Sequence, residues 1–226
     1  CRRRRRQHHG SRHPRLARAG RCARRWEFRK SWALRIIAGD QRGVRLSAPP
    51  GRVLRPTADR VREAIFNILA HGQFEAPALT DASVLDVFAG TGALGLEALS
   101  RGAAHATFIE KSRIILVSLR DNVERCRRAA QSTILERDAL TPPPLSSKAA
   151  PVDFVFIDPP YRKGLMAPAL DALRDGGWFT PATLIIAEMA ADDTPPEGWN
   201  CLESRRYGSA QVCFLGLESA DQRQGD

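Results

Sequence analysis

Long hydrophobic runs are missing from this sequence of 226 residues: no stretch of 18 or more apolar residues occurs, so no membrane-spanning helix is expected. Its five cysteines are scattered, odd in number and never spaced C-x-x-C. That usage is typical of free thiols in a reducing compartment, here the cytoplasm, and predicts neither a disulfide framework nor a zinc site. His71 and His105 have no metal-ligand partner at a useful spacing, so no metal is expected. The sequence has no internal repeats, and its N-terminal stretch has no apolar signal segment. Its length suits one sizeable domain with a small appendage.

Acidic residues are scarce near the N-terminus. Of the 35 Lys and Arg residues, 13 lie within residues 1–33, with Glu27 as the single acid. This stretch lacks the periodicity of a core helix or strand, so we expect a basic, disordered leader, either a tail or an artefact rather than an RNA-binding arm. Residues 34–62 still hold seven Arg against Asp40 and Asp59, an asymmetry that indicates a polyanionic partner. Residues 218–226 are expected to form a polar tail.

Two short apolar runs, residues 34–39 and 44–47, flank turn residues and predict a β-hairpin within an N-terminal unit of residues 34–56. The basic residues around it are Arg42, Arg45, Arg52 and Arg55. Such charges either protect a strand edge or bind phosphates, and because no acid is interleaved after Asp40 we favour phosphate binding. A helix with Thr57 as its N-cap is expected up to His71, and Arg60 and Arg62 flank its apolar stripe, from where they could reach past it to the same phosphates.

Residues 57–217 form the main domain, in which strand and helix patterns alternate. Strands are expected from Val84 onward and at residues 106–109, 134–135, 152–157 and 184–186. Helices are expected at residues 94–100, from the N-cap Ser112 onward, and at residues 165–173. In the second of these helices the predicted buried face is Ile115, Leu119, Val123 and Cys126. Residues 202–207 and 211–217 form a closing hairpin. The order predicts an α/β fold: a doubly wound, mostly parallel sheet with an antiparallel C-terminal edge hairpin and a small N-terminal β-hairpin extension.

One stretch combines a strand, a glycine loop and a helix start. Gly90, Gly92 and Gly95 fit G-x-G-x-x-G, a weak signal alone, at the edge where open α/β sheets bind cofactors. Asp86 lies in the strand four residues earlier, and its carboxylate would repel a pyrophosphate and attract an ammonium group. S-adenosyl-L-methionine carries an ammonium, a sulfonium and no phosphate. We therefore expect it to bind this stretch, including Phe88 and Thr91.

Two more acids follow neighbouring strands. Glu110 ends the second strand, where a carboxylate can accept hydrogen bonds from both hydroxyls of a ribose. Asp138 follows the third strand and is a candidate for the adenine amino group of the cofactor, with a helix cap or loop acid as the alternative. Both are therefore assigned to cofactor binding.

The most specific signal is Asp158-Pro159-Pro160-Tyr161, after the fourth strand. The exocyclic amine of a base is a poor nucleophile because its lone pair is delocalised, and two acceptors, the Asp158 carboxylate and the Pro159 carbonyl, favour its pyramidal form. The two prolines lock the backbone there, and Tyr161 can stack on a flipped base, a contact worth roughly 1–3 kcal/mol. Arg162 is either a phosphate contact or a solvated charge. Because the fourth strand lies beside the first in such a sheet, we expect Asp86 and Asp158 to face one crevice.

These motifs resemble those of the RsmD-type 16S rRNA (guanine-N2)-methyltransferases over residues 34–217, and the run from Arg55 to Glu63 is the most selective for that family. The resemblance implies a Rossmann-like class I methyltransferase fold, S-adenosyl-L-methionine as methyl donor and one guanine of 16S rRNA as target. It also implies an N-terminal hairpin that helps to hold RNA, and an assembling small ribosomal subunit as substrate. Members begin near Leu34, so residues 1–33 depart from the pattern.

Three other functions stay open. An adenine-N6 DNA or RNA methyltransferase could use the same acceptor pair, although the DNA enzymes usually need a recognition insert for which this chain has no room. An NAD(P)-dependent oxidoreductase could use the glycines and Glu110, but the presence of Asp86 and Asp158 disfavours this function. A non-catalytic RNA-binding module is the third. No dimerisation face is evident, so a monomer is expected.

Overall fold

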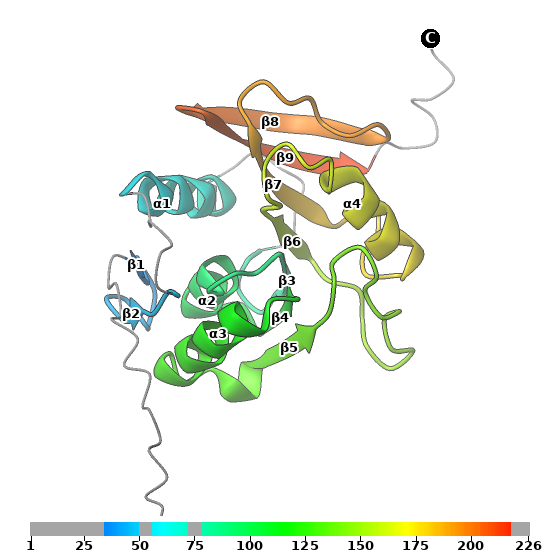
Figure 1. Cartoon of the computed structure of the whole chain (residues 1–226). Coiled ribbons are helices and arrows are strands. Elements are labelled where there is room, and N and C mark those ends of the chain that lie inside the picture. The colour runs from blue at the N-terminus through cyan, green and yellow to red at the C-terminus, as the bar shows by residue number, and fades with distance from the viewer. Residues whose placement is uncertain (1–33, 50–55, 72–77, 218–226) are drawn as a thin grey trace, which may run out of the picture.

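The computed structural model describes residues 34–49, 56–71 and 78–217, which form an α/β domain with a small hairpin beside it (Figure 1). Seven strands form one sheet in the order β5-β4-β3-β6-β7-β9-β8. The strands from β3 to β7 pair in parallel, whereas β9 pairs antiparallel with both β7 and β8. This confirms the doubly wound sheet with its antiparallel edge. The bounds are β3 Ser83–Val87, β4 His105–Glu110, β5 Ser132–Glu136, β6 Phe154–Ile157, β7 Leu184–Ala190, β8 Trp199–Tyr207 and β9 Ala210–Leu217.

Helices pack on both faces of the sheet. One hydrophobic core joins α1, α2 and α3 to one face and includes the fully buried Phe66 and Leu96, and a second core joins α4 to the other face around Leu170. Because alternate residues of a strand point to opposite faces, Val84 belongs to the first core and Leu85 to the second. None of these helices, within the described ranges, is long and apolar enough to cross a bilayer. The bounds are α1 Pro56–His71, α2 Ala93–Ser100, α3 Arg113–Arg125, the 3-10 helix Ala129–Gln131 and α4 Met166–Asp175.

The predicted N-terminal hairpin is present as a separate two-stranded sheet of β1 (Leu34–Arg35) and β2 (Arg45–Leu46), shorter than the apolar runs suggested. It lies beside α1 and α2 (Figure 1). Glu97 of α2 attaches it: this fully buried carboxylate accepts the backbone N–H groups of Ile37 at 2.7 Å and Ala38 at 3.0 Å. The charge of Glu97 is compensated by Arg101 at 2.8 Å and by Arg62 at 3.8 Å. A buried carboxylate is tolerated only when it is paired and hydrogen-bonded in this way.

A buried amide makes a second attachment of the hairpin. Asn122 of α3 accepts the Ser47 backbone N–H at 2.7 Å and donates to the Ser47 carbonyl at 3.0 Å. The same Asn122 amide group donates to the carbonyl of Thr91, in the loop after β3, at 2.9 Å. One side chain thus holds both the exit of the hairpin and the glycine loop.

Three local expectations are corrected by the structure. The first helix begins at Pro56, so Thr57 lies in its first turn rather than at its N-cap, consistent with the preference of proline for the first helical position. Ser112 occupies the N-cap position of α3, but its side chain makes no cap hydrogen bond. On α3, Leu119, Val123 and Cys126 are buried as predicted, but Ile115 is only partly buried and the neighbouring Leu116 is fully buried in its place.

Candidate active site

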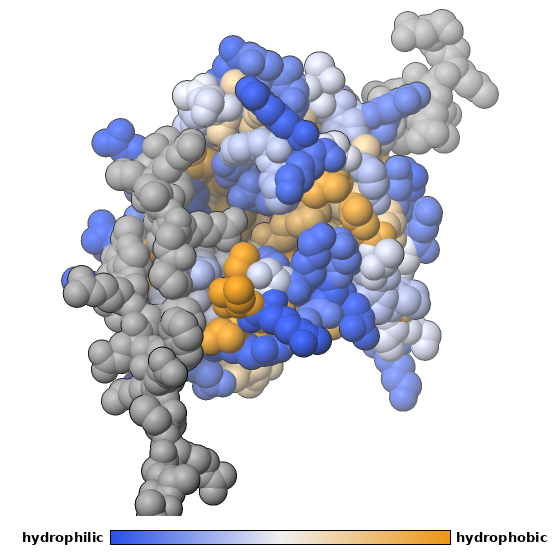
Figure 2. All heavy atoms as spheres, in the orientation of Figure 1, coloured by the Kyte–Doolittle hydropathy of each residue, from blue (hydrophilic) through white to orange (hydrophobic). Residues whose placement is uncertain are grey.

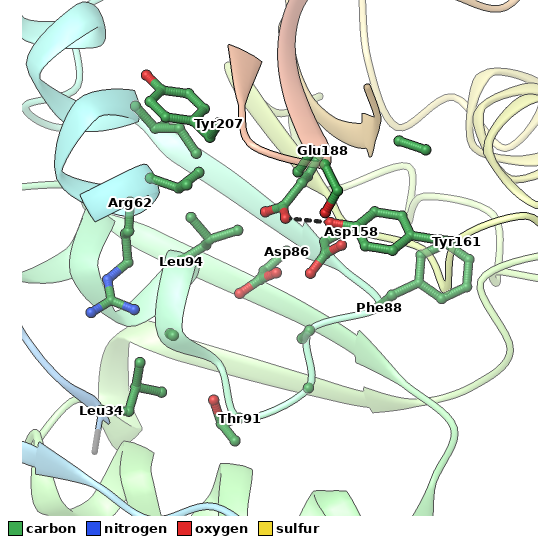
Figure 3. A pocket seen from close by; sticks show the side chains of 18 of the residues that line it. Leu34, Arg62, Asp86, Phe88, Thr91, Leu94, Asp158, Tyr161, Glu188 and Tyr207 are labelled. Carbon is green, nitrogen blue, oxygen red and sulfur yellow. Dashed lines mark hydrogen bonds between the residues drawn. The ribbon is translucent and has the colours of Figure 1, made fainter. Parts of the chain in front are cut away.

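A cavity of about 720 Å³ opens at the edge of the sheet where the parallel strands end. A volume of this size suits a small-molecule site. Its walls come from β1, α1, β3 with the loop and the start of α2 that follow it, the end of β6, β7 and the turn between β8 and β9. Figure 3 shows their side chains converging on one space. In Figure 2 the centre of this face is hollowed, with hydrophobic residues inside and hydrophilic ones around it.

Three carboxylates reach this cavity from three adjacent strands. Asp86 lies in β3, Asp158 directly follows β6, and Glu188 lies in β7. The register pairs Val87 with Ile157 and Ile157 with Ala187, so Asp158 and Glu188 stand at the next position of neighbouring strands. Since side chains alternate between faces, all three point to the face that carries α1 and α2. The expectation that Asp86 and Asp158 share one crevice therefore agrees with the geometry (Figure 3).

Asp86 is buried, with only 3% of its surface exposed, and its Oδ2 accepts the backbone N–H of Gly95 at 2.9 Å. The pKa of this carboxyl is raised to about 8, mainly by burial and to a smaller extent by the nearby charges of Asp158 and Glu110, against the lowering effect of the Gly95 hydrogen bond. A cation placed beside Asp86 would favour its charged form. The site is therefore electrostatically suited to a ligand with a positive group at this point.

The glycine loop joins β3 to α2, and its glycines have two different roles. Gly90 and Thr91 line the cavity together with Phe88, whose φ of 58° places a non-glycine residue in the left-handed region. Gly92 and Gly95 are not part of the cavity wall: a Cβ on Gly92 would lie 2.4 Å from Leu119, and one on Gly95 would lie 2.4 Å from Phe108. Tight packing around α2 disfavours a side chain at both positions, as does the φ of 78° at Gly92, and their contacts with a cofactor stay predictions.

Glu110 and Asp138 lie outside the wall of this cavity. The buried Glu110 carboxylate accepts the backbone N–H of Gly90 at 3.0 Å and that of Ser112 at 2.7 Å, so it ties the glycine loop to the end of β4. Asp138 bonds Lys111 at 2.8 Å, and that hydrogen bond, with one from the Leu140 backbone, lowers the pKa of Asp138. Their cofactor contacts stay predictions.

In the Asp158–Tyr161 segment, Asp158, Pro160 and Tyr161 are exposed, whereas Pro159 is buried. Asp158 and Tyr161 line the cavity, and the two prolines do not. The Tyr161 hydroxyl donates a hydrogen bond of 2.6 Å to Glu188 Oε1, shown as the dashed line in Figure 3. Tyr161 stays 42% exposed at the mouth, where a planar group could meet its ring.

The predicted phosphate contacts divide into exposed and buried side chains. Arg42, Arg45 and Arg60 are exposed, and Arg162 is exposed at the cavity edge, whereas Arg55 lies outside the described residues. The expectation for Arg62 is not supported: it is only 4% exposed and donates to the Arg35 carbonyl at 2.6 Å and to Asp59 at 3.0 Å. Burial lowers the pKa of Arg62, against the raising effect of Asp59 and Glu97. We therefore assign it to the attachment of the hairpin.

Among the cavity residues that were not anticipated from the sequence, Glu188 and Tyr207 carry ionisable side chains. The predicted strand at 184–186 ended two residues before Glu188, and no motif marks either residue. Within the described part of the chain, His, Cys, Asp and Glu nowhere gather in a group of three that could hold a metal ion.

Known proteins resemble this chain over most of its length. Ribosomal RNA small subunit methyltransferase D of Escherichia coli strain K12 is 42% identical over 199 residues, which cover 87% of this chain and 95% of that protein. The protein of the same name from Haemophilus influenzae is 34% identical over 178 residues, covering 77% and 89% of the two chains. The sequence relationship therefore extends over the whole main domain.

Solved structures agree. A protein from E. coli whose name gives it as a methyltransferase matches with a TM-score of 0.67 and 38% identity over 82% of this chain and 98% of that one. A methylase from H. influenzae matches with a TM-score of 0.64 and 30% identity, covering 82% and 99%. Residues 34–216 match the model of the family described as Conserved hypothetical protein 95. The chain therefore belongs to that family, the RsmD-type methyltransferases that its motifs resemble.

Proposed function

We propose that this protein transfers a methyl group from S-adenosyl-L-methionine to the exocyclic N2 amine of one guanine in 16S rRNA of the small ribosomal subunit. The observation that carries the proposal is the shared cavity in which Asp86, at the end of β3, faces Asp158, after β6. The Asp86 carboxylate suits the cationic methyl donor, and the Asp158 carboxylate suits the amine that receives the methyl group. The relatives from E. coli and H. influenzae, by name methyltransferases of small-subunit ribosomal RNA, support the choice of RNA over DNA.

S-adenosyl-L-methionine fits the residues at the ends of β3, β4 and β5. Asp86 is a buried acid whose raised pKa would fall when an ammonium group binds beside it. Each oxygen of the Glu110 carboxylate accepts one backbone N–H, from Gly90 or from Ser112, and each has a second lone pair that can accept a hydrogen bond from a ribose hydroxyl. Asp138 follows β5, where it would meet the adenine amino group. When bound, the sulfonium supplies an activated methyl group.

The Asp158 segment prepares the attacking amine. Its carboxylate and the Pro159 carbonyl would each accept one N–H of the guanine N2 group, which favours the pyramidal form whose lone pair points at the methyl carbon. As the new N–C bond forms, the nitrogen loses one proton, for which the Asp158 carboxylate is the adjacent acceptor. The partly exposed ring of Tyr161 would stack on the flipped base and offset part of the cost of unstacking it.

RNA would reach this cavity across the hairpin and α1. Arg42 and Arg45 on the hairpin and Arg60 on α1 are exposed cations that suit phosphates, and Arg162 stands at the cavity mouth. In this proposal the protein works as a cytoplasmic monomer on an assembling subunit, and no metal takes part.

The test measures transfer of labelled methyl groups to small ribosomal subunits from cells that lack the enzyme, with double-stranded DNA as the competing substrate. The wild-type protein should label guanine N2 in the RNA, and Asp158→Ala should lower the rate by at least a hundredfold while S-adenosylhomocysteine still binds. Label that appears only on DNA adenine would contradict the proposal, as would an Asp158→Ala variant with full activity.

A further inference from the structure

Glu188 is a cavity residue for which the proposed chemistry has no use. It lies in β7, beside the strand that ends at Asp158, and its side chain points into the cavity on the same side as Asp158 and Asp86 (Figure 3). A half-buried carboxylate is unfavourable unless it has hydrogen-bond partners. The question is therefore which groups of the protein and of the bound substrate Glu188 meets.

Tyr161 fixes the orientation of this carboxylate. Its hydroxyl donates to Glu188 Oε1 at 2.6 Å, a distance typical of a strong, charge-assisted hydrogen bond. No donor within the described residues bonds the other oxygen, Oε2, which faces the cavity (Figure 3). Glu188 therefore presents one oriented acceptor beside the proposed position of the base.

The position in the sheet assigns Glu188 to the target rather than to the methyl donor. The residues proposed to bind the donor end β3, β4 and β5, on one side of β6, whereas β7 lies on the other side. Asp158 follows β6 between the two groups. A base whose amine meets Asp158 would therefore have its neighbouring ring atoms close to Glu188.

The edges of the two purines with a reactive amine differ at the neighbouring ring nitrogen. In guanine, N1 next to the N2 amine carries a hydrogen and is a donor. In adenine, N1 next to the N6 amine is an acceptor and would face a carboxylate lone pair to lone pair. A site built to accept a hydrogen bond strongly rejects a ligand that lacks the donor.

We propose that Glu188 is the specificity-determining residue of this enzyme: its carboxylate, held by the Tyr161 hydroxyl, accepts the N1–H of the target guanine and excludes adenine. This inference rests on the proposed methylation of guanine. Tyr161 is then a positioning residue as well as a stacking surface.

The test compares two versions of the RNA substrate at the methylated position, once mapping of the product has located it. One carries guanine, and the other carries 2-aminopurine, which keeps the 2-amine but has no hydrogen on N1. Wild-type protein should prefer guanine in kcat/KM by about a hundredfold or more. Glu188→Gln, which can turn its NH2 group toward the cavity, should reduce that preference to less than tenfold. Tyr161→Phe, which keeps the ring but releases Glu188, should reduce it in part.

The matched control is Glu197→Gln, an exposed residue in the loop before β8, at the end of that strand opposite Tyr207. It should leave the preference unchanged. Thermal unfolding and S-adenosylhomocysteine binding show whether Glu188→Gln is folded, and the preference is a ratio within one variant, so a general loss of activity cancels. An unchanged preference in Glu188→Gln would overturn this inference alone. A wild-type protein that methylates no guanine in small-subunit RNA would overturn the proposed function, and this inference with it.

Discussion

Replacing Asp86 with asparagine tests whether this carboxylate binds the positive group of the methyl donor. Asparagine has nearly the same size and keeps an oxygen for the Gly95 N–H, so the change removes mainly the charge. The pKa of Asp86 is about 8 in the free protein because the side chain is buried near two other acids. At pH 7 most molecules therefore carry a proton there, and a ligand ammonium must displace it.

This displacement sets the size of the expected effect. With a pKa of about 8, the free protein holds about 0.9 proton on Asp86 at pH 7, and binding of the ligand should release nearly all of it. Well below pH 8, each unit by which the pH falls weakens the binding free energy by about 1.4 kcal/mol, a factor of ten in affinity. Binding should therefore tighten about 25-fold between pH 6 and pH 7.5. Asp86→Asn should bind more weakly and lose this pH dependence.

Calorimetric titration with S-adenosylhomocysteine, repeated in buffers of different ionisation enthalpy, measures both affinity and proton release. Asp138→Asn is the matched control: the Lys111 hydrogen bond lowers the pKa of Asp138, so it is ionised throughout this pH range and its loss should leave the slope intact. Wild-type affinity that stays flat from pH 6 to pH 7.5 would refute the reasoning. So would an Asp86→Asn variant with the wild-type slope.

The raised pKa of Asp86 also has a consequence for the unliganded protein. The native state holds the Asp86 proton more tightly than the unfolded chain, so the free energy of unfolding should fall as pH rises from about 4 to about 8. Asp86→Asn should lack this pH-dependent loss of stability. The difference between the denaturant midpoint of Asp86→Asn and that of the wild type should therefore grow in favour of the variant as pH rises across that range.

Two further predictions concern stability. Glu97→Ala should lower the free energy of unfolding by about 3–5 kcal/mol, because Arg62 loses its buried partner and the hairpin loses the acceptor of two N–H groups, and the melting temperature should fall by roughly 6–20 °C. Glu136→Ala, which breaks only surface pairs with Arg113 and Arg120, should cost less than about 1 kcal/mol, and equal losses in the two variants would contradict the assignment. Gly95→Ala should destabilise by about 1–3 kcal/mol in chemical denaturation, because its Cβ would overlap Phe108 at 2.4 Å. Gly216→Ala, with Leu202 at 3.5 Å, should cost much less, and the reverse order would show that packing is not the reason for Gly95.

Strand ends carried most of what the sequence could predict about the site. Asp86 and Asp158 stand at the ends of apolar runs, and a parallel sheet brings neighbouring strand ends together, so their meeting required no knowledge of side-chain contacts. Glu188 was missed although it directly follows the apolar run from Leu184 to Ala187. The strand was predicted to end at Ile186, whereas it continues to Ala190, and a single glutamate in a strand carries no motif.

Contacts with distant residues decide the surroundings of Arg62, Gly92 and Gly95, and local patterns did not predict them. Helical spacing placed Arg62 beside an apolar stripe, as a surface cation would be, but its burial depends on Glu97 and on the hairpin that packs there. In the same way, Gly92 and Gly95 matched a ligand-binding fingerprint, and only the positions of Leu119 and Phe108 reveal their packing role. Local patterns do not contain such long-range contacts.

The amide of Asn122 joins two regions that have separate tasks in the proposed reaction. It bonds Ser47, where the chain leaves the arginine-bearing hairpin, and Thr91, in the loop proposed to hold the methyl donor. A shift of the hairpin on contact with a polyanion must either carry the Thr91 carbonyl with it or give up a buried hydrogen bond. Substrate and donor would then influence each other's affinity to the same degree, because thermodynamic linkage works in both directions.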